Sequence, residues 1–136
     1  MKRKTMETLL LAFELQQRAA AVGFDWPDAR GPLEKVKEEL GELERATGDG
    51  QRATIEEEVG DLLFAVVNLA RKLDIDPQAA LEQANGKFKR RFEQVERLAE
   101  QRGLEMGRAT LEQLDKLWDE VKASRQIGRA SCRERV

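Results

Sequence analysis

Apolar residues recur at every third or fourth position through most of the chain, which is the spacing of amphipathic α-helices. Glycine, proline and aspartate interrupt the pattern at several points and divide the chain into five helical segments. The expected segments are, approximately, 5–22, 32–47, 54–73, 77–101 and 111–123. Because no stretch alternates between apolar and polar residues as a strand would, we predict an all-α fold, a bundle of about five helices.

Three of these helix starts carry a local capping signal. Asp76 is a preferred N-cap residue and is followed by proline, which suits the first position of a helix. Two further starts have the spacing of a capping box, in which two side chains satisfy backbone N–H groups reciprocally. These capping boxes are Thr54 with Glu57, and Thr110 with Gln113.

The third segment is apolar on all sides between residues 62 and 70, where Asn68 is the one polar residue. A helix that is apolar all round is usually buried all round. This segment is therefore expected either inside the bundle or between subunits, and we predict that oligomerisation completes the fold.

Composition and charge exclude several classes of function. The chain has 136 residues and a formal net charge of −2, which does not indicate a partner among nucleic acids or membrane surfaces. It has no histidine and one cysteine, Cys132, which excludes histidine-based triads, the common zinc sites and an internal disulfide framework. Since no segment approaches the roughly 20 apolar residues of a membrane span, we expect a cytoplasmic protein.

The length suits one domain, expected over residues 1–123. Residues 124–136 are basic and lack helical periodicity. We expect them to form a disordered tail outside the domain, either native or a non-native addition.

Two of the helical segments carry acids three residues apart: Glu39 with Glu42, and Glu58 with Asp61. Residues with this spacing are neighbours on one helix face, so antiparallel packing of the segments would gather all four carboxylates. Crowded carboxylates repel one another unless a cation lies between them. Oxygen ligands without histidine or cysteine favour Mg²⁺, with Mn²⁺ as a possible substitute.

A basic cluster on the fourth segment includes Lys87, Arg90 and Arg91, side chains that can bind phosphate groups. Together with a metal site, they suggest metal-assisted hydrolysis of a phosphoanhydride. No Gly-rich loop of the form GxxxxGK[ST] is present, so a P-loop nucleotide hydrolase is excluded. Taken alone, however, charged residues at helical spacing usually form only a solvated surface.

The combination of these motifs resembles a known family. Residues 38–42 (EELGE) and 58–61 (EVGD) are similar to the EExxE…ExxD signature of all-α nucleoside triphosphate pyrophosphohydrolases, above all of the MazG branch. The resemblance extends over roughly residues 23–122. It implies Mg²⁺-dependent hydrolysis of a nucleoside triphosphate between its α and β phosphates, in a homodimer or a higher homo-oligomer.

The resemblance also implies residue roles. The implied metal ligands are Glu39, Glu42, Glu58 and Asp61, and Glu38 is the acid that orients or deprotonates the attacking water, which makes Glu38 and Glu39 the catalytic pair. The implied substrate contacts are Lys35, Lys87, Arg90, Arg91, Trp118 and Lys122. Some relatives have a lysine shortly before the ExxD acids, where this chain has Thr54, so that phosphate contact is not expected here.

Two alternatives remain open at this point. The enzyme could be restricted to dUTP, to dCTP or to phosphoribosyl-ATP, since no residue that reads the base can be identified. From a different class, the chain could be a helical interaction module whose acidic face binds a partner protein without catalysis.

Overall fold

The computed structural model describes the backbone of residues 2–130 and the side chains of residues 7–124. Its helices are α1 (Lys2–Ala21), α2 (Arg30–Asp49), α3 (Arg52–Lys72), α4 (Pro77–Gln101) and α5 (Leu111–Ala130). No strand occurs among the described residues, which confirms the all-α prediction. The chain divides into two compact units, of which the first ends at Leu81 and the second begins at Glu82, within α4.

The turn between α2 and α3 is shorter than expected. Helix α2 continues through Gly48 to Asp49 and ends at Gly50, whose φ of 75° is a left-handed conformation that glycine adopts without strain. Helix α3 then begins at Arg52, and its N-cap residue Gln51 makes no capping hydrogen bond with its side chain. The capping box predicted at Thr54 is therefore wrong, because Thr54 already lies within the helix.

The capping signals at the two later helix starts are confirmed. The backbone N–H of Gln78 donates to Asp76 Oδ1 at 3.0 Å, at the start of α4. At the start of α5, the backbone N–H of Gln113 donates to Thr110 Oγ1 at 3.1 Å, and the backbone N–H of Thr110 donates to Gln113 Oε1 at 2.9 Å. Both starts are thus fixed by side chains that lie next to them in the sequence.

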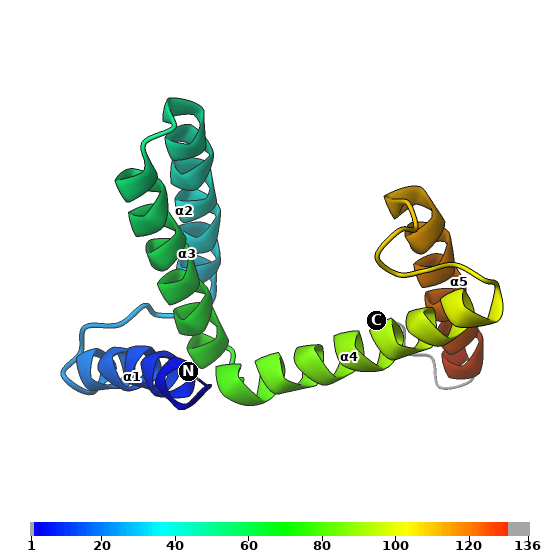
Figure 1. Cartoon of the computed structure of the whole chain (residues 1–136). Helices are drawn as coiled ribbons and strands as arrows, with labels where there is room; N and C mark the ends of the chain where they lie inside the picture. The colour runs from blue at the N-terminus through cyan, green and yellow to red at the C-terminus, as the bar shows by residue number, and fades with distance from the viewer. Residues whose placement is uncertain (1, 131–136) are drawn as a thin grey trace. The chain divides into compact units, whose positions relative to one another are not determined.

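In the first unit, α2 and α3 run antiparallel side by side, and α1 contacts α3 (Figure 1). The contact between α1 and α3 includes a polar link: Gln16 is buried, and its Nε2 donates to the backbone carbonyl of Phe64 at 3.0 Å. The antiparallel pair is the arrangement needed to bring the acids of the two helices together.

The segment between α1 and α2 is held against the last turn of α3 by Asp25. Its carboxylate accepts a hydrogen bond from Arg71 at 2.6 Å and lies 3.3 Å from Lys72 Nζ. Lys72 Nζ also donates to the backbone carbonyl of Trp26 at 2.8 Å. The indole of Trp26 lies over Gly31, where a Cβ atom would clash with the ring. Glycine at this position therefore allows the connector to pack closely on the first turn of α2.

The second unit has its own small hydrophobic core. Val95 and Ala99 of α4 are buried together with Leu117 and Val121 of α5. A bidentate ion pair between Arg102 and Glu120, with N···O distances of 2.8 and 2.7 Å, links the end of α4 to α5. The core and the ion pair hold these two helices together.

Helix α3 remains open to solvent on part of its apolar surface. Leu63 is 62% exposed, and Phe64 and Val66 are each 46% exposed. The packing within the first unit therefore does not bury α3 on all sides. None of the helices in the described part is long and apolar enough to cross a membrane.

Helix α5 extends beyond the boundary expected at residue 123. It continues to Ala130, so the backbone of residues 124–130 is helical, although no regular structure was predicted there. Residues 131–136 lie outside the described part of the chain.

Candidate functional site

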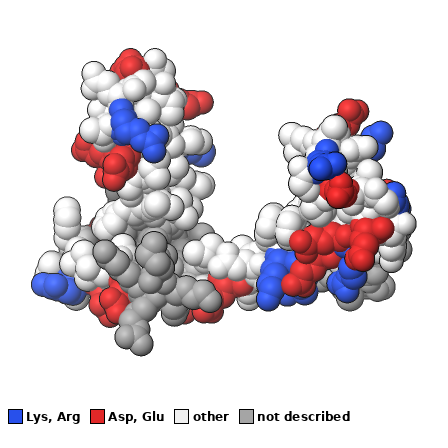
Figure 2. Space-filling model, viewed as in Figure 1, with Lys and Arg blue, Asp and Glu red and all other residues white. Residues whose placement is uncertain are grey.

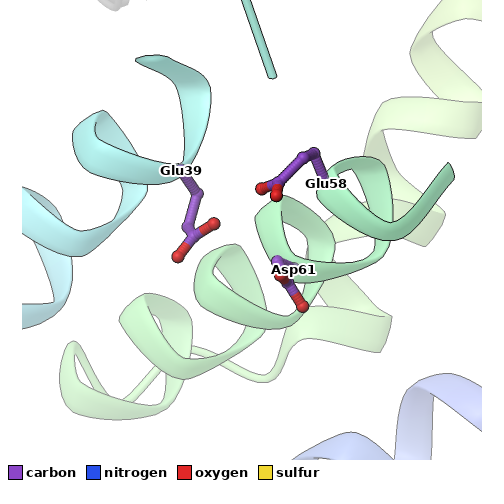
Figure 3. A group of neighbouring side chains, drawn as sticks. All are labelled: Glu39, Glu58 and Asp61. Atoms are coloured by element: carbon purple, nitrogen blue, oxygen red, sulfur yellow. The ribbon is translucent and has the colours of Figure 1, made fainter. Parts of the chain in front are cut away.

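Three of the four predicted acids come together between α2 and α3. Glu39 of α2 and Glu58 and Asp61 of α3 each offer a carboxylate oxygen, and these oxygens all lie within 4.8 Å of one another. Figure 3 shows the Glu58 carboxylate directed toward the helix that carries Glu39, with Asp61 one turn further along α3. Side chains three residues apart on α3 thus share one face, and α2 supplies the third acid across the helix pair.

The three acids differ in their access to solvent. Glu39 is buried, with 8% of its surface exposed, whereas Glu58 is half-buried and Asp61 is exposed. A cation could therefore approach from the side of Asp61 and reach a carboxylate that is almost excluded from water. Burying a charged carboxylate is costly unless an opposite charge accompanies it.

The crowding of the acids affects the protonation of Glu58. Partial burial raises the pKa of the Glu58 carboxyl above its ordinary value of 4.5, and the negative charges of Asp61, Glu39 and Glu42 add to this effect. A raised pKa means that the ionised form of Glu58 is disfavoured where it stands. A bound cation would reverse that preference.

Basic side chains accompany the acids of α2. Lys35 Nζ lies 3.1 Å from Glu39 Oε1 and 3.3 Å from Glu38 Oε2. Arg45 makes a similar contact with Glu42, with an N···O distance of 2.9 Å. Figure 2 shows acidic and basic side chains beside one another on the half of the α2–α3 pair nearest their connecting turn. The acids of α3 differ, because Glu58 and Asp61 make no ion pair with any described side chain.

Glu42 and Glu38 stand apart from the three-acid group. Glu42 is close enough for its charge to contribute to the raised pKa of Glu58, but its carboxylate is held by Arg45. The Glu38 side chain is 58% exposed and contacts Lys35. Their roles as a ligand and as the acid that acts on water stay predictions.

The other predicted substrate contacts belong to the second unit. They are Lys87, Arg90, Arg91, Trp118 and Lys122. The four basic residues of this set make no ion pair among the described residues, and Arg91 Nε is buried without a hydrogen-bond partner there. By contrast, Arg102 of the same unit forms an ion pair with Glu120. The four cations thus retain their capacity to bind an anion.

An aromatic group lies beside these cations. The Phe88 ring stacks on Phe92 at a centroid distance of 5.9 Å and is tilted against Trp118 at 5.4 Å. Trp118 also packs against the core of the second unit, whereas Phe88 is 58% exposed. Trp118 therefore has a structural role in the core, in addition to the nucleotide contact predicted for it.

The donor set of the three-acid group fits a hard divalent cation. All three donors are carboxylates, the ligands that Mg²⁺ and Mn²⁺ prefer, and they come from two helices that hold them at a shared point. The raised pKa of Glu58 indicates that negative charge there is not fully compensated by the protein. The residues are thus suitable to hold such an ion.

Two ion pairs of the first unit were not predicted from the sequence. The contact between Lys35 and Glu39 could have been expected from the sequence, because residues four apart face the same side of a helix. The contact between Asp25 and Arg71 has no such local signal, since 46 residues separate the two.

Comparison with known proteins identifies the family. Residues 31–96 match the sequence profile described as the MazG nucleotide pyrophosphohydrolase domain. The chain is similar to the nucleoside triphosphate pyrophosphohydrolase/pyrophosphatase MazG of Thermotoga maritima, with 45% identity over 114 residues, covering 84% of this chain and 44% of that protein. The nucleoside triphosphate pyrophosphohydrolase of Escherichia coli K12 is 45% identical over 121 residues, covering 88% of this chain and 46% of that protein.

A shorter similarity covers half of the chain. The uncharacterized protein YabN of Bacillus subtilis is 49% identical over 65 residues, which are 48% of this chain and 13% of that protein. The chain spans less than half the length of each of these curated relatives. The family resemblance inferred from the motifs is confirmed. Residues 31–96, which match the family profile, include the three acids of the site.

Proposed function

Because the chain carries a domain of the MazG nucleotide pyrophosphohydrolase family, we propose that it hydrolyses nucleoside or deoxynucleoside triphosphates between the α and β phosphates. One water molecule is added across this bond, and the products are a nucleoside monophosphate and pyrophosphate. The observation that carries the proposal is the group of Glu39, Glu58 and Asp61, whose oxygens lie within 4.8 Å of one another inside the matched segment.

Mg²⁺ is the proposed cofactor, with Mn²⁺ as a substitute. Glu39, Glu58 and Asp61 would hold the ion together with Glu42, which would have to exchange its contact with Arg45. When bound, the ion supplies positive charge that attracts the triphosphate and stabilises charge developing on its oxygens. Without an ion, an acidic group of this kind repels a nucleotide, so activity is expected to depend on the metal.

The remaining assignments are those that the family resemblance implies, and the chemistry of the side chains is compatible with them. Glu38 is proposed to orient or deprotonate the attacking water, a task for which a partly exposed carboxylate is suitable. Five basic side chains are proposed to bind phosphates, and Trp118 is proposed to contact the nucleotide. The phosphate-binding set is Lys87, Arg90, Arg91 and Lys122, with Lys35 from the first unit.

A homodimer or a higher homo-oligomer is part of the proposal. The support is the apolar surface of α3, where Leu63, Phe64 and Val66 are exposed in the packing of the first unit. Exposed apolar patches of this kind are typical of subunit contacts. The expected cytoplasmic location of the protein likewise remains a prediction.

The test is pyrophosphate release from the eight common nucleoside and deoxynucleoside triphosphates, with Mg²⁺ and with EDTA. We expect release with Mg²⁺ that EDTA abolishes. The Asp61→Asn variant should lose at least about 100-fold in kcat/KM, since even outer contacts of a metal site are worth about 10- to 100-fold. Glu56→Gln, which removes an exposed acid from the same helix, is the matched control and should behave as the unchanged protein does.

The same panel separates the alternative functions. Release from dUTP, dCTP or added phosphoribosyl-ATP alone would identify a base-restricted enzyme. A helical interaction module predicts no pyrophosphate from any of these substrates, and that outcome would refute the proposed activity.

A further inference from the structure

Lys35 occupies a position that its predicted role as a phosphate contact does not explain. It lies one helical turn before Glu39, and its ammonium nitrogen is 3.1 Å from that carboxylate and 3.3 Å from Glu38. Glu39 is the most buried acid of the site, with 8% of its surface exposed. Among the described residues, Lys35 is the only cation in contact with it.

We propose that Lys35 is an exchangeable internal counterion of the metal site. With no ion bound, its ammonium group neutralises Glu39; when a metal–nucleotide complex binds, the ammonium group leaves Glu39 to the metal and turns to the phosphates. The inference rests on the proposed function, because it assumes that the three acids hold a divalent ion. It assigns Lys35 a second position and predicts an effect on metal affinity that a phosphate contact alone would not have.

The burial of Glu39 explains why such a counterion is needed. A carboxylate that is removed from water and has no partner is strongly destabilising, whereas exposed acids remain hydrated. Glu58 and Asp61 contact no basic side chain among the described residues, and they add negative charge next to Glu39. Without a bound ion and without Lys35, the site would therefore hold three mutually repelling acids.

The shape of lysine suits an exchangeable contact. Its ammonium is a compact charge on a flexible four-carbon stem, so the head can move while the stem stays on the helix. The Lys35 side chain is 43% exposed, which leaves its head access to solvent and to a ligand. Arg45 does not serve the same purpose, because it contacts Glu42 and not the buried acid.

The exchange predicts opposite effects on two affinities. Because the ammonium competes with a cation for Glu39, its removal should strengthen the binding of a divalent ion alone. The same removal should weaken the binding of a triphosphate, since one positive charge near the phosphates is lost. A lysine that only bound phosphate would not produce the first effect, and a lysine that only stabilised the fold would not produce the second.

The first experiment measures Mn²⁺ binding without nucleotide, from the electron paramagnetic resonance signal of free Mn²⁺. Lys35→Met should bind Mn²⁺ about three- to tenfold more tightly than the unchanged protein, since a like charge close to the ion is removed. Lys37→Met is the matched control, because Lys37 lies on the same helix and pairs with the exposed Glu34 at 3.5 Å. It should change Mn²⁺ affinity by less than about twofold, since exposed charges are largely screened.

The second experiment repeats the titration with a non-hydrolysable α,β-imido deoxynucleoside triphosphate and Mn²⁺. Lys35→Met should bind the analogue several-fold more weakly, while Lys37→Met should not. Unchanged or weaker Mn²⁺ binding by Lys35→Met would overturn the inference. If Lys35→Met fails to fold, the double variant Lys35→Met/Glu39→Gln should fold again, because no buried charge is then left unpaired; a double variant that also fails to fold counts against the counterion.

The two proposals fail in different ways. If the unchanged protein releases no pyrophosphate from any triphosphate, the proposed function is wrong. If it releases pyrophosphate but Lys35→Met gains no affinity for Mn²⁺, only the counterion exchange is wrong.

Discussion

Glu58 combines a destabilising charge with a proposed functional role. Its pKa is raised, first by partial burial and then by the charges of Asp61, Glu39 and Glu42. The folded protein thus holds the Glu58 proton more tightly than the unfolded chain does, and ionisation of Glu58 lowers stability as the pH rises through its pKa. This cost is expected at neutral pH, where the site must be ionised in order to bind a cation.

Replacing Glu58 by glutamine should therefore stabilise the protein while it abolishes metal binding. In EDTA at pH 7, we expect the unfolding temperature of Glu58→Gln to exceed that of the unchanged protein. The difference should vanish below pH 4.5, the ordinary value of the group, where Glu58 is protonated in both states. Thermal unfolding followed by circular dichroism measures the unfolding temperatures of both proteins at the two pH values. A variant less stable than the unchanged protein at pH 7 would contradict this interpretation.

Lys87 illustrates the opposite case, a charge that no acid in the described part of the chain neutralises. It makes no ion pair among the described residues, so its removal leaves no acid unpaired and should not affect folding. We expect Lys87→Ala to raise KM for a triphosphate by about tenfold, the effect of losing one charge-assisted contact of about 1.4 kcal/mol. Lys89→Ala, on the same helix, is the control; an unchanged kcat/KM for Lys87→Ala would remove Lys87 from the site.

The connector between α1 and α2 depends on one carboxylate. Arg71 is the main cause of the lowered pKa of Asp25, and the backbone N–H of Trp26 and the ammonium of Lys72 contribute as well. A lowered pKa means that ionised Asp25 stabilises the fold above its ordinary pKa of 3.8, and that this stabilisation is lost as the pH falls through the lower value. The contact holds the start of α2 in place, and α2 carries Glu39.

Asp25→Asn should thus lower the urea midpoint of unfolding by the same amount throughout the range from pH 5 to pH 8. Below pH 3.8, the difference from the unchanged protein should shrink, because Asp25 becomes protonated in the unfolded chain while the folded protein still holds it ionised. Asp28→Asn is the control from the same connector. Its partner Arg30 is 90% exposed, and exposed pairs contribute little. Equal effects of the two substitutions would show that Asp25 has no special role.

How far the helices could be predicted depends on whether a signal was local. The starts of α4 and α5 were predictable, because Asp76 and Thr110 cap the backbone a few residues away. The start of α3 was not, because the turn at Gly50 ends α2 late and leaves two residues between the helices. There the geometry of the helix pair, and not the capping propensity of Thr54, decides where α3 begins.

The same distinction applies to the site. The spacing of Glu58 and Asp61 predicted a shared face on α3, and antiparallel packing supplied Glu39 as expected. No spacing could predict which of the two α2 acids would be buried, since this depends on how deeply each side chain enters the pair. Glu39 is buried, whereas the Glu42 side chain is partly exposed and pairs with Arg45.

The apolar surface of α3 is explained if a second subunit covers it in the full assembly. Leu63 is 62% exposed and lies among apolar neighbours on that helix, and such a surface is expected to be covered in solution. The protein should therefore elute with at least twice the mass of one chain in size-exclusion chromatography with light scattering. This expectation follows from the uncovered hydrophobic area and does not depend on catalysis.

A charge placed on that surface should separate the subunits. Leu63→Glu should shift the mass at micromolar concentration toward one chain, because an ionised carboxylate in an apolar contact costs several kcal/mol unless it is paired. Leu111→Glu is the matched control, since Leu111 is 74% exposed at the start of α5 and the same substitution adds the same charge. It should keep the mass of the assembly. If Leu63→Glu also keeps that mass, α3 does not form the subunit contact, and another surface must hold the assembly together.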